Sequence, residues 1–259
     1  MASISIIGAG AVGQAVGKGF DRMGLDVVFY DVDKAVLEKL KNEGYEVSSK
    51  IPEEMDYYMI CVPERYVEDV VRSIRDRLLL AKVIIKSTVP VGTTKKLWNL
   101  WDKACPIYHN PEFLVEATAE RDFLEPNMVV LGSPSKYGRG DIGLGAVVDD
   151  LYWWVEPNKI IYTDSDTSEM VKLALNGYLS TVIGYWNDIH KVCGKLGVNS
   201  HEVGRICSRD PRITTYGAVR HGKSYAGKCL PKDTQALIEL AKSLGINDTV
   251  FEKVQERNL

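Results

Sequence analysis

The chain has 259 residues, 45% hydrophobic and 26% charged, enough for one large or two ordinary globular domains. A formal net charge of −3 gives no electrostatic reason to expect nucleic acid or an anionic membrane as a partner. The apolar runs are short, so we expect no membrane-spanning helix, and the opening MASISIIGAGAVG lacks the cationic start of a signal peptide.

Five widely spaced cysteines without a CxxC pair indicate reduced thiols and a cytoplasmic location. The four histidines have no metal-ligand spacing with the cysteines, so we expect no metal.

Short apolar segments alternate with helical patterns in the first part of the chain. Helices are expected at about 11–23 and 34–44. Buried strands that alternate with helices are typical of an α/β fold with a doubly wound, Rossmann-type parallel sheet. The segments expected as strands are SISIIGA (3–9), DVVFYD (26–31), DYYMICV (56–62), KVIIKS (82–87) and NMVVLG (127–132).

The pattern changes near residue 165 and is helical from there on. One long helix is expected over 165–197, with shorter ones at 200–208 and 231–245. The sequence therefore predicts an NAD-binding Rossmann domain over 1–165 and an all-helical domain over 166–259.

The glycine-rich turn GAGAVG follows the first expected strand and opens the first expected helix. Gly8 permits a tight turn, Gly10 lets the backbone approach a pyrophosphate, and Gly13 allows close packing of helix on strand. Backbone amides near Ala11 and Val12, at the helix start, are expected to bind the pyrophosphate. A glycine turn in a fold that binds no cofactor is the alternative.

Asp31 ends the second expected strand, about 20 residues after the turn. Its carboxylate is expected to accept hydrogen bonds from the adenosine ribose hydroxyls and to repel a 2′-phosphate. The sequence therefore favours NAD over NADP as the cofactor.

Five further stretches stand out in one order along the chain. They are STVPVGTT (87–94), NPEFLVEATAERDFLEP (110–126), EMVKLALNGYLS (169–180), DPRI (210–213) and GKCLPKD (227–233). Together they resemble the UDP-glucose/GDP-mannose dehydrogenase family, and the resemblance extends over the whole chain. It implies an NAD-dependent enzyme that oxidises the C6 alcohol of a nucleotide sugar to a carboxylate. It also implies two NAD used in succession and a cysteine that carries the intermediate.

Cys229 matches the family cysteine. Pro231 suits the first residue of a helix, which would place Cys229 just before a helix N-terminus, where the dipole favours a thiolate. Lys228 and Lys232 add positive charge nearby. A buried, inert cysteine is the alternative, and the other four cysteines are expected in packing roles.

Two further positions match family residues that work with the cysteine. Asp233 matches an aspartate that acts in proton transfer and on water, and Thr88 matches a threonine that helps to hold this water. Alternatively, Asp233 is an acidic residue in the first turn of a helix and Thr88 is a hydroxyl at the end of a strand, both with a structural role only.

Lys172 and Asn176 are four residues apart and so share one face of the long helix. The resemblance gives this pair a role in stabilising an alkoxide or oxyanion. A solvated helix face is the alternative, but the apolar stretch MVKLALNGYL around the pair argues against it.

Three more residues match positions near the family's substrate. Glu112 and Glu116 match glutamates that handle protons or position the sugar, and both could instead face solvent. Arg212 matches an arginine that reaches the substrate across a dimer, with local pairing as the alternative. The family dimerises through its long helix, which implies a homodimer formed by the helical domain.

The sequence departs from the family in the segment before the cysteine, which reads HGKSYAGKC. Ser224 and Ala226 stand where the family has glycines in a G-x-G-G run, and this leaves the identity of the sugar open. The stretch CVPERYVEDV also lacks the usual Thr-Pro.

Family members normally continue into a second Rossmann-like domain that binds much of the nucleotide, whereas this sequence stops at FEKVQERNL. A naturally short product, a truncated one, and one completed by another polypeptide all stay open.

The sequence thus predicts a nucleotide-sugar 6-dehydrogenase similar to UDP-glucose 6-dehydrogenase, or the catalytic core of one. Two other hypotheses remain. One is a two-domain NAD-dependent dehydrogenase of a small hydroxy acid, which would not need Cys229. The other is an NAD-binding, dimerising protein without turnover.

Overall fold

The computed structural model describes residues 2–74, 81–101, 105–135, 142–225, 227 and 229–258, so Ala226 and Lys228 lie outside the described residues. The chain forms two compact units, Met1–Met170 and Val171–Leu259, and each is described by itself. The expected boundary after residue 165 falls in the first turn of helix α7 (Ser165–Leu196) and stays a prediction.

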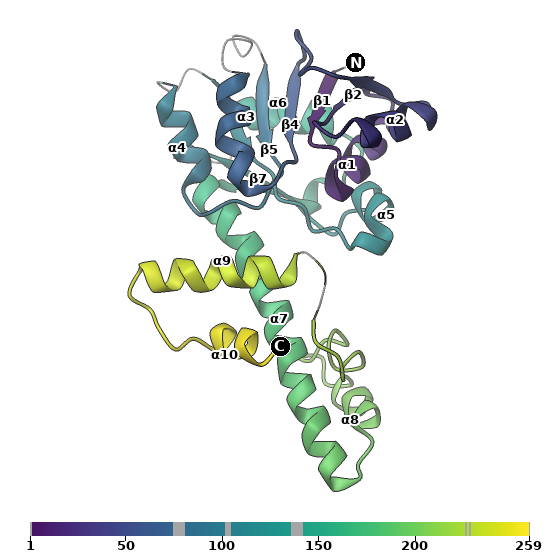
Figure 1. Cartoon of the computed structure of the whole chain (residues 1–259), viewed down its shortest axis with the longest axis vertical. Coiled ribbons are helices and arrows are strands. Elements are labelled where there is room, and N and C mark those ends of the chain that lie inside the picture. The colour runs from purple at the N-terminus through teal and green to yellow at the C-terminus, as the bar shows by residue number, and fades with distance from the viewer. Residues whose placement is uncertain are drawn as a thin grey trace. The chain divides into compact units, whose positions relative to one another are not determined.

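The first unit is built on one eight-stranded sheet with the order β3-β2-β1-β4-β5-β6-β7-β8 (Figure 1). Neighbouring strands run parallel except β6 and β7, which pair antiparallel at His109 and Gly132. The expected Rossmann-type fold is confirmed, and this antiparallel junction corrects the expectation of a purely parallel sheet. The strands are β1 (Ser3–Ile7), β2 (Asp26–Tyr30), β3 (Glu46–Ser48), β4 (Tyr57–Ile60), β5 (Lys82–Ile85), β6 (Ile107–His109), β7 (Val129–Ser133) and β8 (Ile160–Asp164).

Hydrophobic cores lie on both faces of this sheet, which explains why its central strands are continuous apolar runs. In β4, Tyr57 and Met59 belong to one core, and Tyr58 and Ile60 belong to the other. Side chains of α1, α2, α5 and α6 join the first core, and those of α3 and α4 join the second. These helices are α1 (Ala11–Arg22), α2 (Lys34–Asn42), α3 (Val67–Ser73), α4 (Thr93–Leu100), α5 (Ala119–Leu124) and α6 (Ile142–Leu151), with 3₁₀ turns η1 (Glu64–Tyr66), η3 (Glu116–Thr118) and η5 (Pro157–Lys159).

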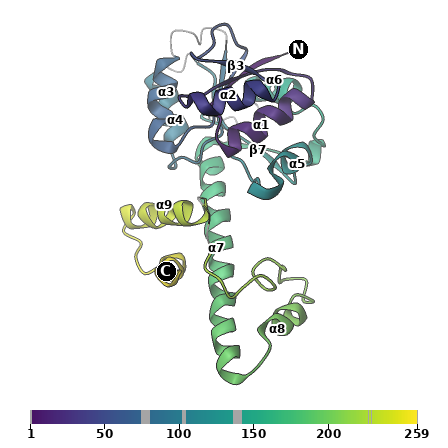
Figure 2. The same ribbon diagram turned by 45° about the vertical axis from the view of Figure 1, so that its right-hand side comes forward.

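The second unit is helical and is organised around α7, which α9 crosses (Figure 2). Two glycines of α7 make close approach possible. A Cβ atom on Gly177 would lie 2.6 Å from Leu237 of α9, and one on Gly184 would lie 2.6 Å from Val254 of α10. The other helices of the unit are α8 (Ser200–Cys207), α9 (Leu230–Ser243) and α10 (Val250–Arg257).

Among the strands and helices of the described residues, β3, β6, β8, α6 and α10 match no segment that the sequence analysis named. Strands β3 and β6 have 3 residues each, too few to show a period. Across the part of the chain that the structure describes, no helix combines the length and apolarity needed to cross a membrane.

Candidate active site

The glycine-rich turn between β1 and α1 has the backbone geometry that its sequence requires. Gly8 has a φ of +96°, and its N–H donates to the Tyr30 carbonyl at 2.9 Å. A Cβ atom on Gly13 would lie 1.9 Å from the Gly8 carbonyl oxygen, so only glycine fits there. A Cβ atom on Gly10 would meet nothing within 4 Å. Open space at Gly10, beside the first amides of α1, fits a pyrophosphate.

Ala11 and Val12 are the first two residues of α1, and Gly10 before them offers no capping side chain. Their amides therefore belong to the helix turn whose N–H groups lack carbonyl partners within the helix. This is the arrangement in which a helix N-terminus binds an anion.

Asp31 follows β2 and holds the glycine turn. Its Oδ2 accepts the Ala9 N–H at 2.7 Å, and its Oδ1 accepts the Asp33 N–H at 2.9 Å. Each carboxylate oxygen can accept a second hydrogen bond, so the half-buried Asp31 keeps capacity for ribose hydroxyls.

The loop after β6 carries both glutamates, in different environments. Glu112 is buried, and its carboxylate accepts the Leu114 N–H at 2.7 Å. Glu116 opens η3 and is exposed. Thr88 lies beyond the end of β5 and is half-buried. All three belong to the first unit.

A buried lysine that the sequence analysis did not single out supports this loop. Lys86, which follows β5, is 5% exposed, and its ammonium donates to Asn110 Oδ1 at 2.7 Å. Asn110 in turn donates to the Val130 carbonyl at 2.7 Å. Lys86 thus links the ends of neighbouring strands where the Glu112 loop begins.

Cys61, which follows β4, is electrostatically unsuited to act as a thiolate. Burial raises the pKa of its thiol to about 12; Lys86 opposes this rise and Glu112 adds to it. The expectation of a packing role fits this environment.

In the second unit, three polar side chains expected in the site are buried together with apolar neighbours. Lys172, Asn176 and Asp233 are 4%, 5% and 1% exposed. Asn176 donates its side-chain N–H to Asp233 Oδ2 at 2.6 Å. The alternative of a solvated helix face for Lys172 and Asn176 is therefore wrong.

Cys229 is the N-cap residue of α9, and its side chain is exposed. Its carbonyl accepts the Asp233 N–H at 2.9 Å, which closes the first turn of the helix. The sequence analysis expected Pro231 to be the first residue of this helix. Because α9 begins at Leu230, Pro231 is its second residue. The Lys232 ammonium lies 2.8 Å from Asp233 Oδ1, so its charge is directed to that carboxylate.

Arg212 forms the local pair that was the alternative to substrate binding. Its guanidinium donates to both carboxylate oxygens of Asp210, at 2.9 and 2.6 Å. The side chain is 86% exposed. A role across a dimer stays a prediction.

The structure thus brings the expected residues together in two groups. Asp31 meets the glycine turn in the first unit, and Asn176 meets Asp233, one helical turn from Cys229, in the second. The sequence analysis missed Lys86 and two asparagines, Asn187 and Asn258, that bond to the backbone ahead of Cys229. A single lysine in an apolar stretch, IIKS, was the one signal that could have identified Lys86.

Comparison with protein families matches most of the chain. Residues 52–153 match the NAD binding domain of the UDP-glucose/GDP-mannose dehydrogenase family, and residues 166–259 match its central domain. Residues 3–90 also match a family of coenzyme F420-dependent NADP oxidoreductases.

Similar proteins include the UDP-glucose 6-dehydrogenase TuaD of Bacillus subtilis, 30% identical over 100% of this chain and 63% of its own length. A UDP-glucose 6-dehydrogenase of Campylobacter jejuni is 29% identical over 98% of this chain and 71% of its own length. The chain therefore spans less than two thirds of TuaD.

Among solved structures, a UDP-glucose dehydrogenase from Pyrobaculum islandicum aligns with a TM-score of 0.88 at 28% identity. The alignment covers 100% of this chain and 68% of the Pyrobaculum islandicum chain. A 3-hydroxyisobutyrate dehydrogenase from Mycobacterium tuberculosis aligns over 100% of this chain and 92% of its own, with a TM-score of 0.76. Its identity is 16%, so this likeness concerns the fold alone.

Proposed function

Because the chain belongs to the UDP-glucose/GDP-mannose dehydrogenase family, we propose that it carries the catalytic core of an NAD-dependent nucleotide-sugar 6-dehydrogenase. The reaction is oxidation of the C6 alcohol of a UDP-glucose-like sugar to the uronic acid. Homology to several UDP-glucose 6-dehydrogenases supports a uridine nucleotide as the first substrate to test.

The observation that carries this proposal is the buried hydrogen bond between Asn176 and Asp233. It ties a carboxylate one turn from Cys229 to the helix face that presents Lys172. Burial of an amine, an amide and a carboxylate costs free energy unless they serve each other or a ligand. A fold that needed only packing would place apolar side chains there.

The chemistry assigns a separate task to each side chain. Lys172 and Asn176 stabilise negative charge on the C6 oxygen, first as an alkoxide and then in the tetrahedral adducts. The Cys229 thiolate, favoured by the N-terminus of α9, adds to the C6 aldehyde and forms a thiohemiacetal. Loss of hydride from C6 gives a thioester, and attack of water on its carbonyl carbon releases the carboxylate and the thiolate.

Asp233 and Thr88 are assigned to the water that attacks the thioester. Asp233 takes a proton from this water, and Thr88 holds the water by hydrogen bonding. Glu112 exchanges protons with the substrate, and Glu116 and Arg212 position the sugar, Arg212 from the second copy in a dimer. NAD, when bound, accepts a hydride in each of the two oxidation steps.

The first unit is assigned to the cofactor. Gly8, Gly10 and Gly13 shape the turn, and the amides of Ala11 and Val12 bind the pyrophosphate. Asp31 selects NAD over NADP. The open space at Gly10 and the position of Asp31 beside Ala9 support this assignment.

A homodimer through the helical unit belongs to the same proposal. Tyr178, Tyr185 and Val192 of α7 are exposed apolar residues seven positions apart, so they form one stripe along the helix. A second copy of this chain would bury such a stripe. We also propose a cytoplasmic location, which the widely spaced cysteines support.

The decisive experiment measures NADH formed per nucleotide sugar consumed, with UDP-glucose as the first substrate. Two NADH per sugar, with uronic acid as product and loss of acid formation in Cys229→Ser, is the expected result. One NADH per substrate on a small hydroxy acid, unaffected by Cys229→Ser, would favour the hydroxy-acid dehydrogenase. NAD binding without NADH from any nucleotide sugar would favour the protein without turnover.

A further inference from the structure

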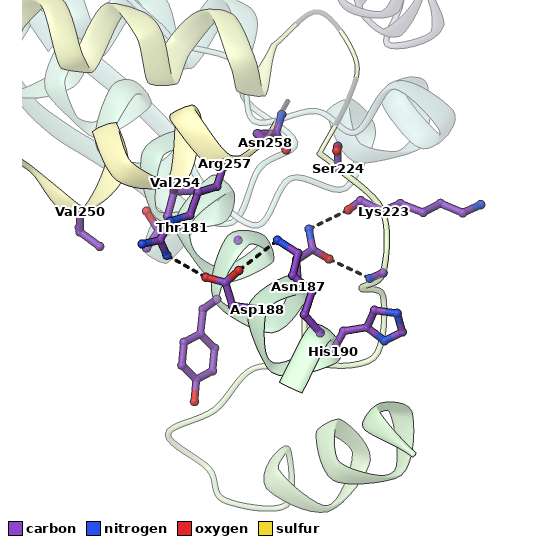
Figure 3. Close-up of a pocket in the computed structure, with 14 residues that line it drawn as sticks. Thr181, Asn187, Asp188, His190, Lys223, Ser224, Val250, Val254, Arg257 and Asn258 are labelled. Atoms are coloured by element: carbon purple, nitrogen blue, oxygen red, sulfur yellow. Dashed lines mark hydrogen bonds and ion pairs between the residues drawn. The ribbon is translucent and has the colours of Figure 1, made fainter. Parts of the chain in front are cut away.

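The segment that leads to Cys229 is attached to the helical unit by its backbone. Residues 222–225 belong to no helix or strand, so any protein partners of their N–H and C=O groups come from elsewhere in the unit. Two asparagines supply them, one on α7 and one at the end of α10. Both line a cavity of about 370 Å³ in this unit (Figure 3).

Asn187 of α7 makes the first attachment with both ends of its amide. Its Oδ1 accepts the Gly222 N–H at 2.8 Å, and its Nδ2 donates to the Lys223 carbonyl at 2.8 Å (Figure 3). The side-chain amide therefore accepts one backbone N–H and donates to one backbone carbonyl, as the backbone of a neighbouring strand would.

Asn258, the residue after α10, repeats the arrangement three residues along. Its Oδ1 accepts the Tyr225 N–H at 2.8 Å, and its Nδ2 donates to the Tyr225 carbonyl at 2.9 Å. The Tyr225 side chain is buried, and its hydroxyl donates to Gln255 of α10. Gln255 also donates to the Pro231 carbonyl at 3.2 Å, so α10 contacts the chain on both sides of Cys229.

The helices that carry the two asparagines are themselves joined. Arg257 of α10 pairs with Asp188 of α7 at 2.9 Å (Figure 3), beside the close approach of Val254 to Gly184. The two amides thus project from helices that are joined to each other, and both are bonded to residues 222–225.

The chain on either side of Tyr225 contains glycines, which populate many backbone conformations when nothing holds the chain in place. Gly222 and Gly227 have φ angles of +89° and +87°, in the left-handed region that glycine populates among many others. Only a short connection separates Tyr225 from Cys229, at most about 14 Å along an extended chain. Fixing Tyr225 therefore restricts where Cys229 can lie.

We propose that Asn187 and Asn258 are positioning residues for the Cys229 thiol. Nucleophilic addition requires the sulfur close to the aldehyde carbon and in line with it, and a misplacement of about 1 Å can cost a hundredfold in rate. The catalytic part of this inference rests on the proposed function. The backbone attachment itself does not.

The test uses Asn187→Ala and Asn258→Ala. Each alanine removes both the acceptor for the N–H and the donor to the carbonyl. Asn247→Ala is the matched control, because Asn247 is exposed and makes one local contact with the Gly245 carbonyl at 3.4 Å. Should an alanine variant fail to fold, the serine variant at the same position, small and polar, replaces it.

Hydrogen exchange tests the attachment without any substrate. We expect the amides of Gly222 and Tyr225 to exchange about tenfold faster in Asn187→Ala and Asn258→Ala respectively, while exchange in α8 stays unchanged and Asn247→Ala has no effect. Exchange within about twofold of the parent protein would overturn the inference.

Steady-state turnover tests the positioning role. The first oxidation, alcohol to aldehyde, does not use Cys229, whereas the second does. The variants should therefore release aldehyde, and the NADH formed per sugar should fall from two towards one. A purely structural defect would slow both oxidations together and leave this ratio at two, which would overturn the positioning role even with faster exchange.

If the parent protein turns over no nucleotide sugar, Cys229 alkylation tests the positioning of the thiol independently of the proposed function. Loosening the segment should allow the N-cap of α9 to fray, so iodoacetamide should label Cys229 about threefold more slowly at neutral pH, as the thiolate loses the helix dipole. An unchanged labelling rate would overturn the role.

Discussion

Asn176 donates its side-chain N–H to the carboxylate of Asp233 at 2.6 Å, although 57 positions separate the two residues in the chain. The bond joins α7 to the first turn of α9, and neither side chain is more than 5% exposed. It therefore has consequences for stability as well as for the proposed chemistry.

Replacing Asn176 by alanine removes one partner of a buried carboxylate. We expect the free energy of unfolding to fall by about 1–3 kcal/mol, the cost of an unmade buried hydrogen bond to a charged group. Urea denaturation followed by circular dichroism measures this loss, with Asn247→Ala as the exposed control. A loss below about 0.5 kcal/mol, the usual range of surface substitutions, would contradict the buried bond.

Asp31→Ala should weaken NAD binding by about 1–3 kcal/mol, because a charged acceptor for the ribose hydroxyls is lost. Part of that loss comes from the glycine turn, since Asp31 also accepts the Ala9 N–H. Titration calorimetry with NAD and NADP measures both affinities, and Asp26→Ala, exposed at the start of β2, is the control. Equal affinity of the parent protein for the two cofactors would rule out selection by Asp31.

Cys229→Ser should abolish formation of the carboxylate and leave NAD binding intact. A serine hydroxyl stays protonated at the helix N-terminus that favours a thiolate, so it cannot replace the nucleophile. Product analysis and intact-mass spectrometry after a single turnover on the aldehyde provide the measurement. Cys207→Ser, at the end of α8, is the control. Unchanged acid formation in Cys229→Ser would return Cys229 to a structural role.

Alkylation should separate Cys61 from Cys229 by its pH dependence. Because burial raises the pKa of Cys61 to about 12, the thiol form dominates until the pH approaches that value. At pH 8 about 1 in 10,000 molecules carries the Cys61 thiolate, so labelling there should be slow and should rise with pH. Peptide mass spectrometry after iodoacetamide treatment follows each site. Labelling of Cys61 at pH 8 as fast as in the unfolded chain would contradict this environment.

UDP should bind weakly to a polypeptide of these 259 residues. The chain spans 63% of TuaD, and contacts to the nucleotide from the remaining part would be absent. Loss of such remote contacts costs turnover as well as affinity, because they hold the reacting sugar in place. Calorimetry with UDP and UDP-glucose tests this. Submicromolar UDP binding would mean that these residues already form a complete nucleotide pocket.

Much of the architecture could be predicted because its signals are local. The glycine turn, Asp31 after β2 and the long α7 follow from spacing and periodicity within a few turns of chain. The pairing of Arg212 with Asp210 could only be an alternative, because two nearby charged residues can pair with each other or with a ligand. Asn187 and Asn258 could not be found, since their partners are backbone groups far along the chain, and such bonds leave no side-chain pattern.

The attachment of residues 222–225 to Asn258 also bears on the order in which the protein is completed during synthesis. Asn258 and Gln255 follow Cys229 in the chain, so α10 has to leave the ribosome before the segment ahead of the cysteine has all of its partners. The first unit, which translation finishes much earlier, can fold in the meantime. The Cys229 thiol thus reaches its final place only after translation has passed Asn258.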